Sequence, residues 1–149
     1  MHKVWLRRKY IPSSKDLIKT KRELRGIFVA IMGGHATNRR LRLIQLRTRA
    51  ISATGIHELL LTDGAEIKPG DIVDRVSFVG FFEVTLGGVL KVGEEARVNE
   101  KLLGEVIGFD LTHYPNHMNI LLKGPKLVDG MMLGLAPGDE IVFDMPIER

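Results

Sequence analysis

The chain has 149 residues, a formal net charge of +4 at pH 7 and no cysteine. Its length is that of one domain with its own core, and the lack of cysteine excludes disulfides, thiolate metal sites and a cysteine nucleophile. Branched aliphatic residues are plentiful and the 16 glycines follow no period, which excludes a disordered or collagen-like chain. We therefore expect a single domain over residues 1–149, in a reducing compartment.

The N-terminal residues predict neither a signal peptide nor a membrane anchor. The basic residues between Met1 and Tyr10 are not followed by an apolar segment. The longest apolar stretch, Ile27–Met32, is far shorter than the roughly 20 residues that cross a bilayer. We expect a soluble, cytoplasmic protein with no membrane partner.

Helix is predicted at two places only. Serines 13 and 14 offer an N-cap, and the segment Lys15–Leu24 that follows consists largely of good helix formers. Asn99–Leu103 is compatible with a single helical turn. The sequence therefore predicts one short N-terminal helix.

Most of the remaining chain predicts short strands separated by glycine-rich turns. The clearest strand is Val76–Leu86, where apolar residues alternate and Gly80 leaves a gap typical of a close backbone approach. Ile56–Leu61 fits either a strand or a short helix. The other predicted strands are Arg40–Arg49, Glu105–Thr112 and His117–Lys123.

A turn motif of the form hydrophobic-x-Pro-Gly-Asp-x-hydrophobic occurs in Ile67–Val73 and Leu135–Val142, with a looser copy at Val89–Glu94. Proline presets φ, glycine accepts positive φ, and the acid can bond local backbone donors. The copies are either an internal duplication or ordinary turns. The motif resembles the turns of cradle-loop and swapped-hairpin barrels. With seven to nine strands, it predicts a mainly β fold: a small, closed or partly open, cradle-loop-like β-barrel with the N-terminal helix.

The charges are strongly segregated along the chain. The first 50 residues hold 14 of the 22 Lys and Arg but only two of the 18 Asp and Glu, so a basic N-terminal third precedes an acidic remainder. Either the two parts contact each other, within the domain or between subunits, or the basic part contacts RNA or a phosphorylated ligand. Trp5 and Tyr10 flank a basic cluster that would suit RNA, although nine aromatic residues in all leave few for a stacking surface.

A predicted hairpin formed by Glu105–Thr112 and His117–Lys123 carries the first group of candidate site residues. With residues 113–116 as its loop, Asp110 opposes Asn119 and Thr112 opposes His117 on one polar face, with His113 at the tip.

Three interpretations of this hairpin stay open. Asp110, His113 and His117 offer ligands for a divalent transition metal, with His35 or His57 as the fourth. Alternatively, His117 beside Asp110 acts as a general acid–base group. In the third interpretation the polar face simply meets water or a neighbouring subunit.

A glycine-rich basic loop carries the second group of candidates. Gly33 and Gly34 follow an apolar strand and precede His35 and three arginines, which suits a backbone nest for a phosphate or carboxylate. A plain hairpin connection explains the glycines equally well. The spacing is that of neither a Walker loop nor a dinucleotide-binding loop.

The leading hypothesis is a binding module for a small anionic ligand that bears a phosphate or carboxylate. Its ligand-binding residues would be His35, Arg39, Arg40, Arg42, Asp110, Thr112, His113, His117 and Asn119. The alternatives are a metal-dependent enzyme using Asp110, His113 and His117, and a structural homo-oligomer or RNA-binding module. Segregated charges and unpaired strand edges also predict self-association. The sequence decides neither whether the protein is an enzyme nor which reaction it would catalyse.

Overall fold

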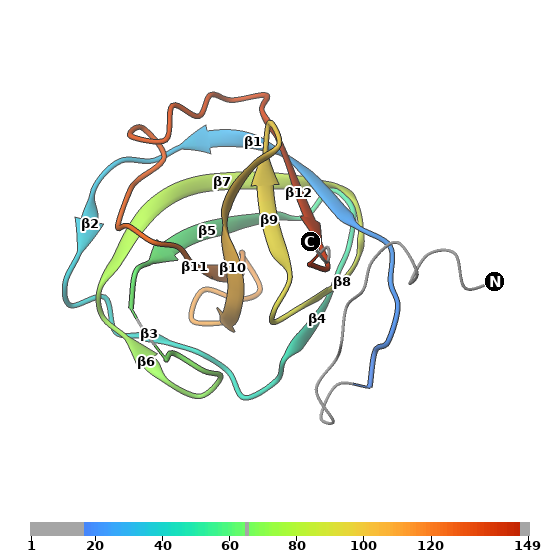
Figure 1. Cartoon of the computed structure of the whole chain (residues 1–149), viewed down its shortest axis with the longest axis horizontal. Coiled ribbons are helices and arrows are strands. Elements are labelled where there is room, and N and C mark those ends of the chain that lie inside the picture. Colours follow the sequence, from blue (N-terminus) through green and yellow to red (C-terminus); the bar gives the residue numbers. More distant parts are fainter. Residues whose placement is uncertain (1–16, 65, 147–149) are drawn as a thin grey trace.

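The computed structural model describes residues 17–64 and 66–146, and these form a mainly β structure with no helix (Figure 1). The prediction of a mainly β fold is confirmed. The strands are β1 Leu24–Ile31, β2 His35–Ala36, β3 Leu41–Arg42, β4 Thr48–Ile51, β5 Ile56–Thr62, β6 Ile72–Val73, β7 Val76–Leu86, β8 Gly88–Lys91, β9 Glu95–Val98, β10 Lys101–Asp110, β11 Asn119–Lys123 and β12 Glu140–Asp144.

The prediction of an N-terminal helix is wrong. Residues 17–23 have no regular structure, and Leu24 already begins β1. Side chains tie this segment to the turns that flank β8, because Lys21 Nζ binds Glu94 Oε1 at 2.7 Å and Arg22 donates to the carbonyl of Gly87 at 2.9 Å. These long-range contacts outweigh a weak helical preference. The predicted N-cap at residues 13 and 14 lies outside the described residues.

Seven strands form a closed ring by hydrogen bonding, in the order β1-β12-β9-β10-β11-β5-β7 and back to β1. All pairs of the ring are antiparallel except β11 and β5, which run parallel. Strand β2 adds to β7 outside the ring, and β3–β6 and β4–β8 form two separate pairs. Closure leaves the ring strands with a neighbour on each side.

The predicted strand Val76–Leu86 coincides with β7. The predicted strand Arg40–Arg49 is wrong, because the chain forms only the short β3 and β4, at either end of this segment. Between them the backbone makes a hydrogen bond to the ring, because the Ile44 N–H donates to the carbonyl of Phe109 on β10 at 2.8 Å. The predicted turn at 99–103 is also not helical, since residues 99 and 100 have positive φ and connect β9 to β10.

The three copies of the turn motif have the same local geometry. In each, a backbone N–H donates to the acid three residues later, the N–H of that acid donates back to the first carbonyl, and the intervening glycine has positive φ. The bonded residues are Lys68 and Asp71, Ala136 and Asp139, and Lys91 and Glu94, with Gly70, Gly138 and Gly93 between them. The turn chemistry expected from the sequence is therefore present in all three copies.

Two apolar clusters lie on opposite faces of the ring strands. The larger takes residues from all seven strands, including Phe28, Phe82 and Phe143, and fills the interior. The smaller lies outside, between β5, β10, β11 and the β3–β6 pair. It contains Leu41, Leu43, Leu60, Val73, Val76, Ile107 and Leu121.

Strand β5 contributes to both clusters, because successive side chains of a strand point to opposite faces. Leu59 and Leu61 belong to the interior cluster, whereas Leu60 belongs to the outer one. The same alternation places His57 on the inner face of β5 and Glu58 on its outer face.

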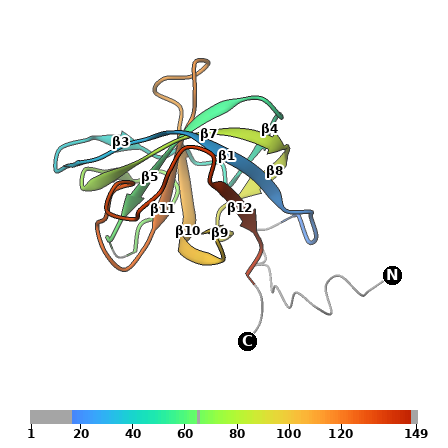
Figure 2. The same cartoon turned by 90° about the horizontal axis from the view of Figure 1, so that it is seen from above.

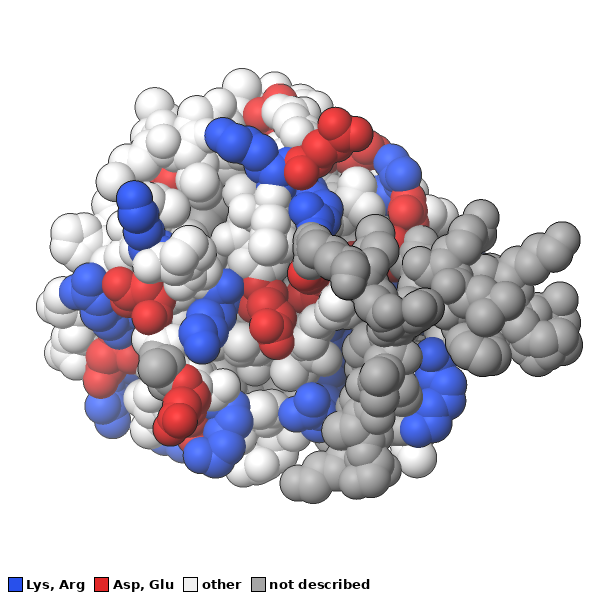
Figure 3. Space-filling model, viewed as in Figure 1, with Lys and Arg blue, Asp and Glu red and all other residues white. Residues whose placement is uncertain are grey.

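The segregated charges contact each other within the chain. Among the described residues, ion pairs join basic residues of the first 50 to acidic residues of the remainder, such as Lys21–Glu94 at 2.7 Å, Arg25–Glu140 at 2.8 Å and Arg40–Asp74 at 3.3 Å. Figure 3 shows Lys and Arg interspersed with Asp and Glu on the face drawn. These pairs support the interpretation that the two parts lie against each other.

Candidate functional site

The glycine-rich loop does not present an open nest for an anion. The Gly34 N–H donates to Asp129 Oδ2 at 2.7 Å, and the Met132 N–H donates to Asp129 Oδ1 at 2.8 Å. These hydrogen bonds hold the pKa of Asp129 below its usual value. A carboxylate of the chain itself therefore occupies the position predicted for a ligand. His35 lies exposed on the short strand β2.

The three arginines of this loop are engaged separately. Arg40 binds Asp74 through its backbone N–H at 2.9 Å and through its guanidinium at 3.3 Å. Arg42 donates its backbone N–H to Asp110 at 2.7 Å, and its side chain is exposed. Arg39 exerts its charge on the buried carboxylate of Glu58. The prediction that they hold one ligand together is not supported by this arrangement.

Asp110 and Asn119 are strand partners, as the predicted hairpin required, but both are completely buried. The Asp110 carboxylate accepts hydrogen bonds from the Arg42 N–H at 2.7 Å, from the N–H and hydroxyl of Thr112 at 2.8 and 3.0 Å, and from Asn119 Nδ2 at 3.2 Å. Burial raises the pKa of Asp110, but these hydrogen bonds outweigh burial and bring the pKa below its usual value. Asp110 therefore fastens the basic loop to the hairpin.

The histidines of the hairpin connection face a different carboxylate. His117 Nε2 lies 3.5 Å from Glu58 Oε1, and His117 Nδ1 lies 2.8 Å from Asn116 Oδ1. The His113 and Phe81 rings each lie with their centroids 5.1 Å from that of His117. The expectation that His117 pairs with Asp110 is thus wrong, since all four donors around Asp110 come from elsewhere. Within the described residues, no three His, Asp or Glu side chains form a group that could hold a metal ion.

Glu58 is the residue of this cluster that sequence reasoning missed. The residue is 6% exposed, and its strand neighbours are Phe81 on β7 and Asn119 on β11. Burial raises the pKa of Glu58, and the charges of His117, Arg39 and His113 oppose that rise only in part. The sequence carries no local signal for this burial, because Glu58 follows the polar His57 and a charged residue in a strand is ordinarily interpreted as solvent-facing.

Glu58→Gln is expected to raise the free energy of unfolding more at pH 8 than at pH 4. The pKa of Glu58 is higher in the folded than in the unfolded protein, so the wild type loses stability as pH rises through the window between the two values. Glutamine does not ionise and avoids this loss. Thermal unfolding of both proteins from pH 4 to 8 measures the difference. Glu100→Gln, at an exposed turn, is the control, and a Glu58→Gln benefit that does not grow with pH would contradict the assignment.

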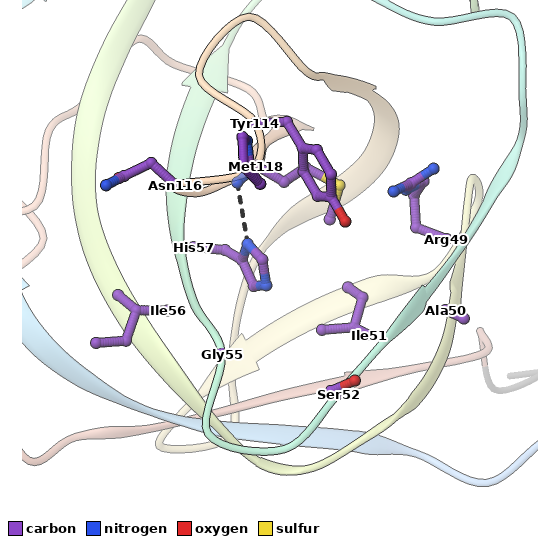
Figure 4. Close-up of a pocket in the computed structure, with 11 residues that line it drawn as sticks. Arg49, Ala50, Ile51, Ser52, Gly55, Ile56, His57, Tyr114, Asn116 and Met118 are labelled. Carbon is purple, nitrogen blue, oxygen red and sulfur yellow. Dashed lines mark hydrogen bonds between the residues drawn. The ribbon is translucent and has the colours of Figure 1, made fainter.

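A pocket of about 230 Å³ opens on the other side of the same hairpin connection. Residues from β4, from the start of β5 and from the β10–β11 connection line it, and this connection projects from the ring (Figure 2). We call it the Arg49 pocket. Its lining consists of Arg49, Ala50, Ile51, Ser52, Gly55, Ile56, His57, Tyr114, Pro115, Asn116 and Met118. Figure 4 shows the Tyr114 hydroxyl pointing toward the space between Arg49, His57 and Ile51.

His57 is a neutral hydrogen-bond donor in this pocket. Its Nδ1 accepts the Met118 N–H at 3.0 Å, so the ring proton resides on Nε2. Burial lowers the pKa of His57, and the charges of His117 and Arg49 lower it further. At neutral pH the ring is therefore uncharged.

Arg49 supplies the positive charge of the pocket. Its Nε is buried and has no hydrogen-bond partner among the described residues. The guanidinium lies 5.7 Å from the centroid of the Tyr114 ring, within the range of a cation–π contact. Arg49 is not recognisable as a site residue from the sequence, because Arg49, His57 and Tyr114 come from three separate segments and form no local motif.

Comparison with known proteins gives one match. The model of a family described as a family of unknown function (DUF6917) matches residues 18–144. No curated protein and no solved structure matches the chain. In the described segments, no helix of the length and apolarity needed to span a bilayer is present.

Proposed function

Because the chain belongs to DUF6917, a family of unknown function, we propose its function from the site itself: it binds a small anionic ligand, bearing a carboxylate or a phosphate, in the Arg49 pocket. The observation that carries this proposal is that Arg49 is the one formally charged side chain among the described lining residues, and that its Nε has no hydrogen-bond partner among the described residues. An anion at the guanidinium would supply both a counter-ion and hydrogen-bond acceptors.

The polar groups of the pocket favour an anion over a cation. Among the described residues that line it, Arg49 alone carries a formal charge, and no carboxylate is present. His57 Nε2 offers a proton, and the hydroxyls of Ser52 and Tyr114 add two more donors. The volume of about 230 Å³ lies below the range of pockets for drug-sized molecules, so the ligand is small.

The position of the pocket suits a barrel that binds a ligand at its mouth. We propose that the ring of seven strands is a small barrel of this kind. Ile51 and Met118 belong to the interior cluster and also line the pocket, so the pocket floor is continuous with the core. A rigid ring supports one side of the pocket, and the β10–β11 connection supplies the other.

Arg49→Gln is expected to weaken binding of the anion at least tenfold. Hydrogen bonds to a charged group contribute about 1.5–3 kcal/mol, which corresponds to roughly ten- to hundredfold in affinity. A thermal-shift panel of carboxylates, phosphates and nucleotides, followed by calorimetry on the hits, measures the effect. Arg42→Gln is the matched control, because the Arg42 side chain is exposed and only its backbone N–H is engaged. A panel without hits, or equal binding by Arg49→Gln, would contradict the proposal.

The other functions considered from the sequence stay predictions. Self-association, a cytoplasmic location and RNA binding are tested by none of these observations, and the cluster between Trp5 and Tyr10 lies outside the described residues. The metal-dependent alternative loses Asp110 as a ligand, because four protein donors already bind its carboxylate. The anion pocket is therefore the function that the geometry supports best.

A further inference from the structure

The shape of the donor set in the Arg49 pocket distinguishes between the two kinds of anion. We infer that the pocket selects a monocarboxylate with a short apolar body over a phosphate ester, an inference that rests on the proposed function. Three features carry it: a single cation, the planar shape of the Arg49 guanidinium, and an apolar wall.

A single cation matches a single negative charge. A monoalkyl phosphate carries nearly two negative charges above pH 7, because its second pKa is about 6. Arg49 is the one formally charged side chain among the described lining residues. His57 does not supply a second charge, since its Nδ1 accepts the Met118 N–H and its pKa is lowered by burial and by the neighbouring His117 and Arg49. A phosphate would thus keep one charge without a counter-ion.

The planar guanidinium of Arg49 favours a planar ligand group. The Tyr114 ring lies 5.7 Å from the guanidinium carbon, and Nε has no partner. Nε and the adjacent terminal nitrogen form the side edge of the guanidinium, which binds both oxygens of a carboxylate in parallel. A tetrahedral phosphate would leave its further oxygens to the few remaining donors.

The apolar side of the pocket accommodates a hydrocarbon body. Ile51 and Met118 are 5% and 2% exposed, and Ile56 lies at the rim. A ligand body placed against them is removed from water, which makes binding about fourfold tighter for each buried methylene. The small volume limits the body to a few carbons before the affinity stops rising.

The test measures binding of acetate, propionate, butyrate and hexanoate to the full-length protein at pH 7.5, beside propyl phosphate, inorganic phosphate and butyramide. Chemical shifts of the His57 ring and the Met118 methyl group report occupancy of the pocket. We expect affinity to rise about fourfold per methylene over the first members, butyrate to bind at least tenfold tighter than propyl phosphate, and butyramide not to bind. Arg49→Lys, which keeps the charge but loses the side edge, should reduce the preference for butyrate.

The outcomes separate the inference from the proposed function. If propyl phosphate binds as tightly as butyrate or more tightly, or if affinity does not change with chain length, the inference is wrong and anion binding stands. If none of these anions shifts the His57 and Met118 signals, and the wider panel also gives no hits, both are wrong. Preserved butyrate selectivity in Arg49→Lys would overturn the assignment of the side-edge contact.

Discussion

Asp110→Ala is expected to lower the free energy of unfolding by about 2–4 kcal/mol, because it removes the shared acceptor of several buried donors. The Arg42 N–H, the Thr112 N–H and Asn119 Nδ2 all lose their partner, and Asn119 is completely buried. Asn119 Oδ1 already has no hydrogen-bond partner among the described residues, so its acceptor cannot compensate for the bond that Nδ2 loses. Loss of Asp110 would also release the basic loop from the hairpin.

Urea denaturation measures this loss, and Asp63→Ala is its control. Asp63 pairs with Arg75 at the surface, so its removal should change stability little. The effect of Asp110 should also depend on pH. Its pKa is lower in the folded than in the unfolded protein, so its stabilising effect is complete above about pH 4 and is lost as pH falls through the folded value. An Asp110→Ala protein as stable as the wild type at pH 7 would show that the Asp110 carboxylate does not hold the basic loop against the hairpin.

Gly80→Ala is expected to lower stability by about 3 kcal/mol or more, or to prevent folding. A Cβ atom at Gly80 would overlap the carbonyl oxygen of Ala30, which belongs to the neighbouring strand β1. Gly80 and Ile31 are paired in the ladder between β7 and β1, and this ladder closes the ring. Backbone cannot yield as the end of a flexible side chain does, so the two strands would have to separate.

Gly33→Ala is the matched control for this substitution. A Cβ atom at Gly33 would meet Met131 Cγ at 3.4 Å and Asp129 Oδ2 at 3.8 Å, both ordinary contact distances. Circular dichroism and thermal unfolding of the two variants should therefore differ clearly. Equal stability of Gly80→Ala and Gly33→Ala would show that β1 and β7 do not approach each other as closely as described.

Local sequence patterns predicted the parts of the fold that depend on neighbouring residues. The alternation in Val76–Leu86 defined β7, and its gap at Gly80 marked a close approach to another strand. The opposition of Asp110 and Asn119 followed from the length of one hairpin connection. The parallel pairing of β11 with β5, and the closure of β1 on β7, join segments far apart in the chain, for which a single sequence has no local signal.

The candidate site was predicted only in part, for the same reason. The basic loop and the hairpin do meet, through the Arg42 N–H and Asp110, but this contact is structural. Glu58 and Arg49 each lie next to the hairpin connection in space, although one belongs to β5 and the other to β4. Apolar patterning treats a lone charged residue in a strand as a solvent-facing position, so it could not reveal a buried carboxylate or an unsatisfied guanidinium.

Strand β5 carries an imidazole and a carboxylate on consecutive residues, and His57 points to its inner face while Glu58 points to its outer face. The length of the turn at residues 52–55 therefore determines whether the His57 imidazole or the Glu58 carboxylate points toward Arg49. Deleting one residue there would move Glu58 into the place of His57, where its charge would neutralise the guanidinium and repel a carboxylate ligand. We expect natural variation in this turn to keep its length, since the proposed ligand preference depends on strand parity as much as on any side chain.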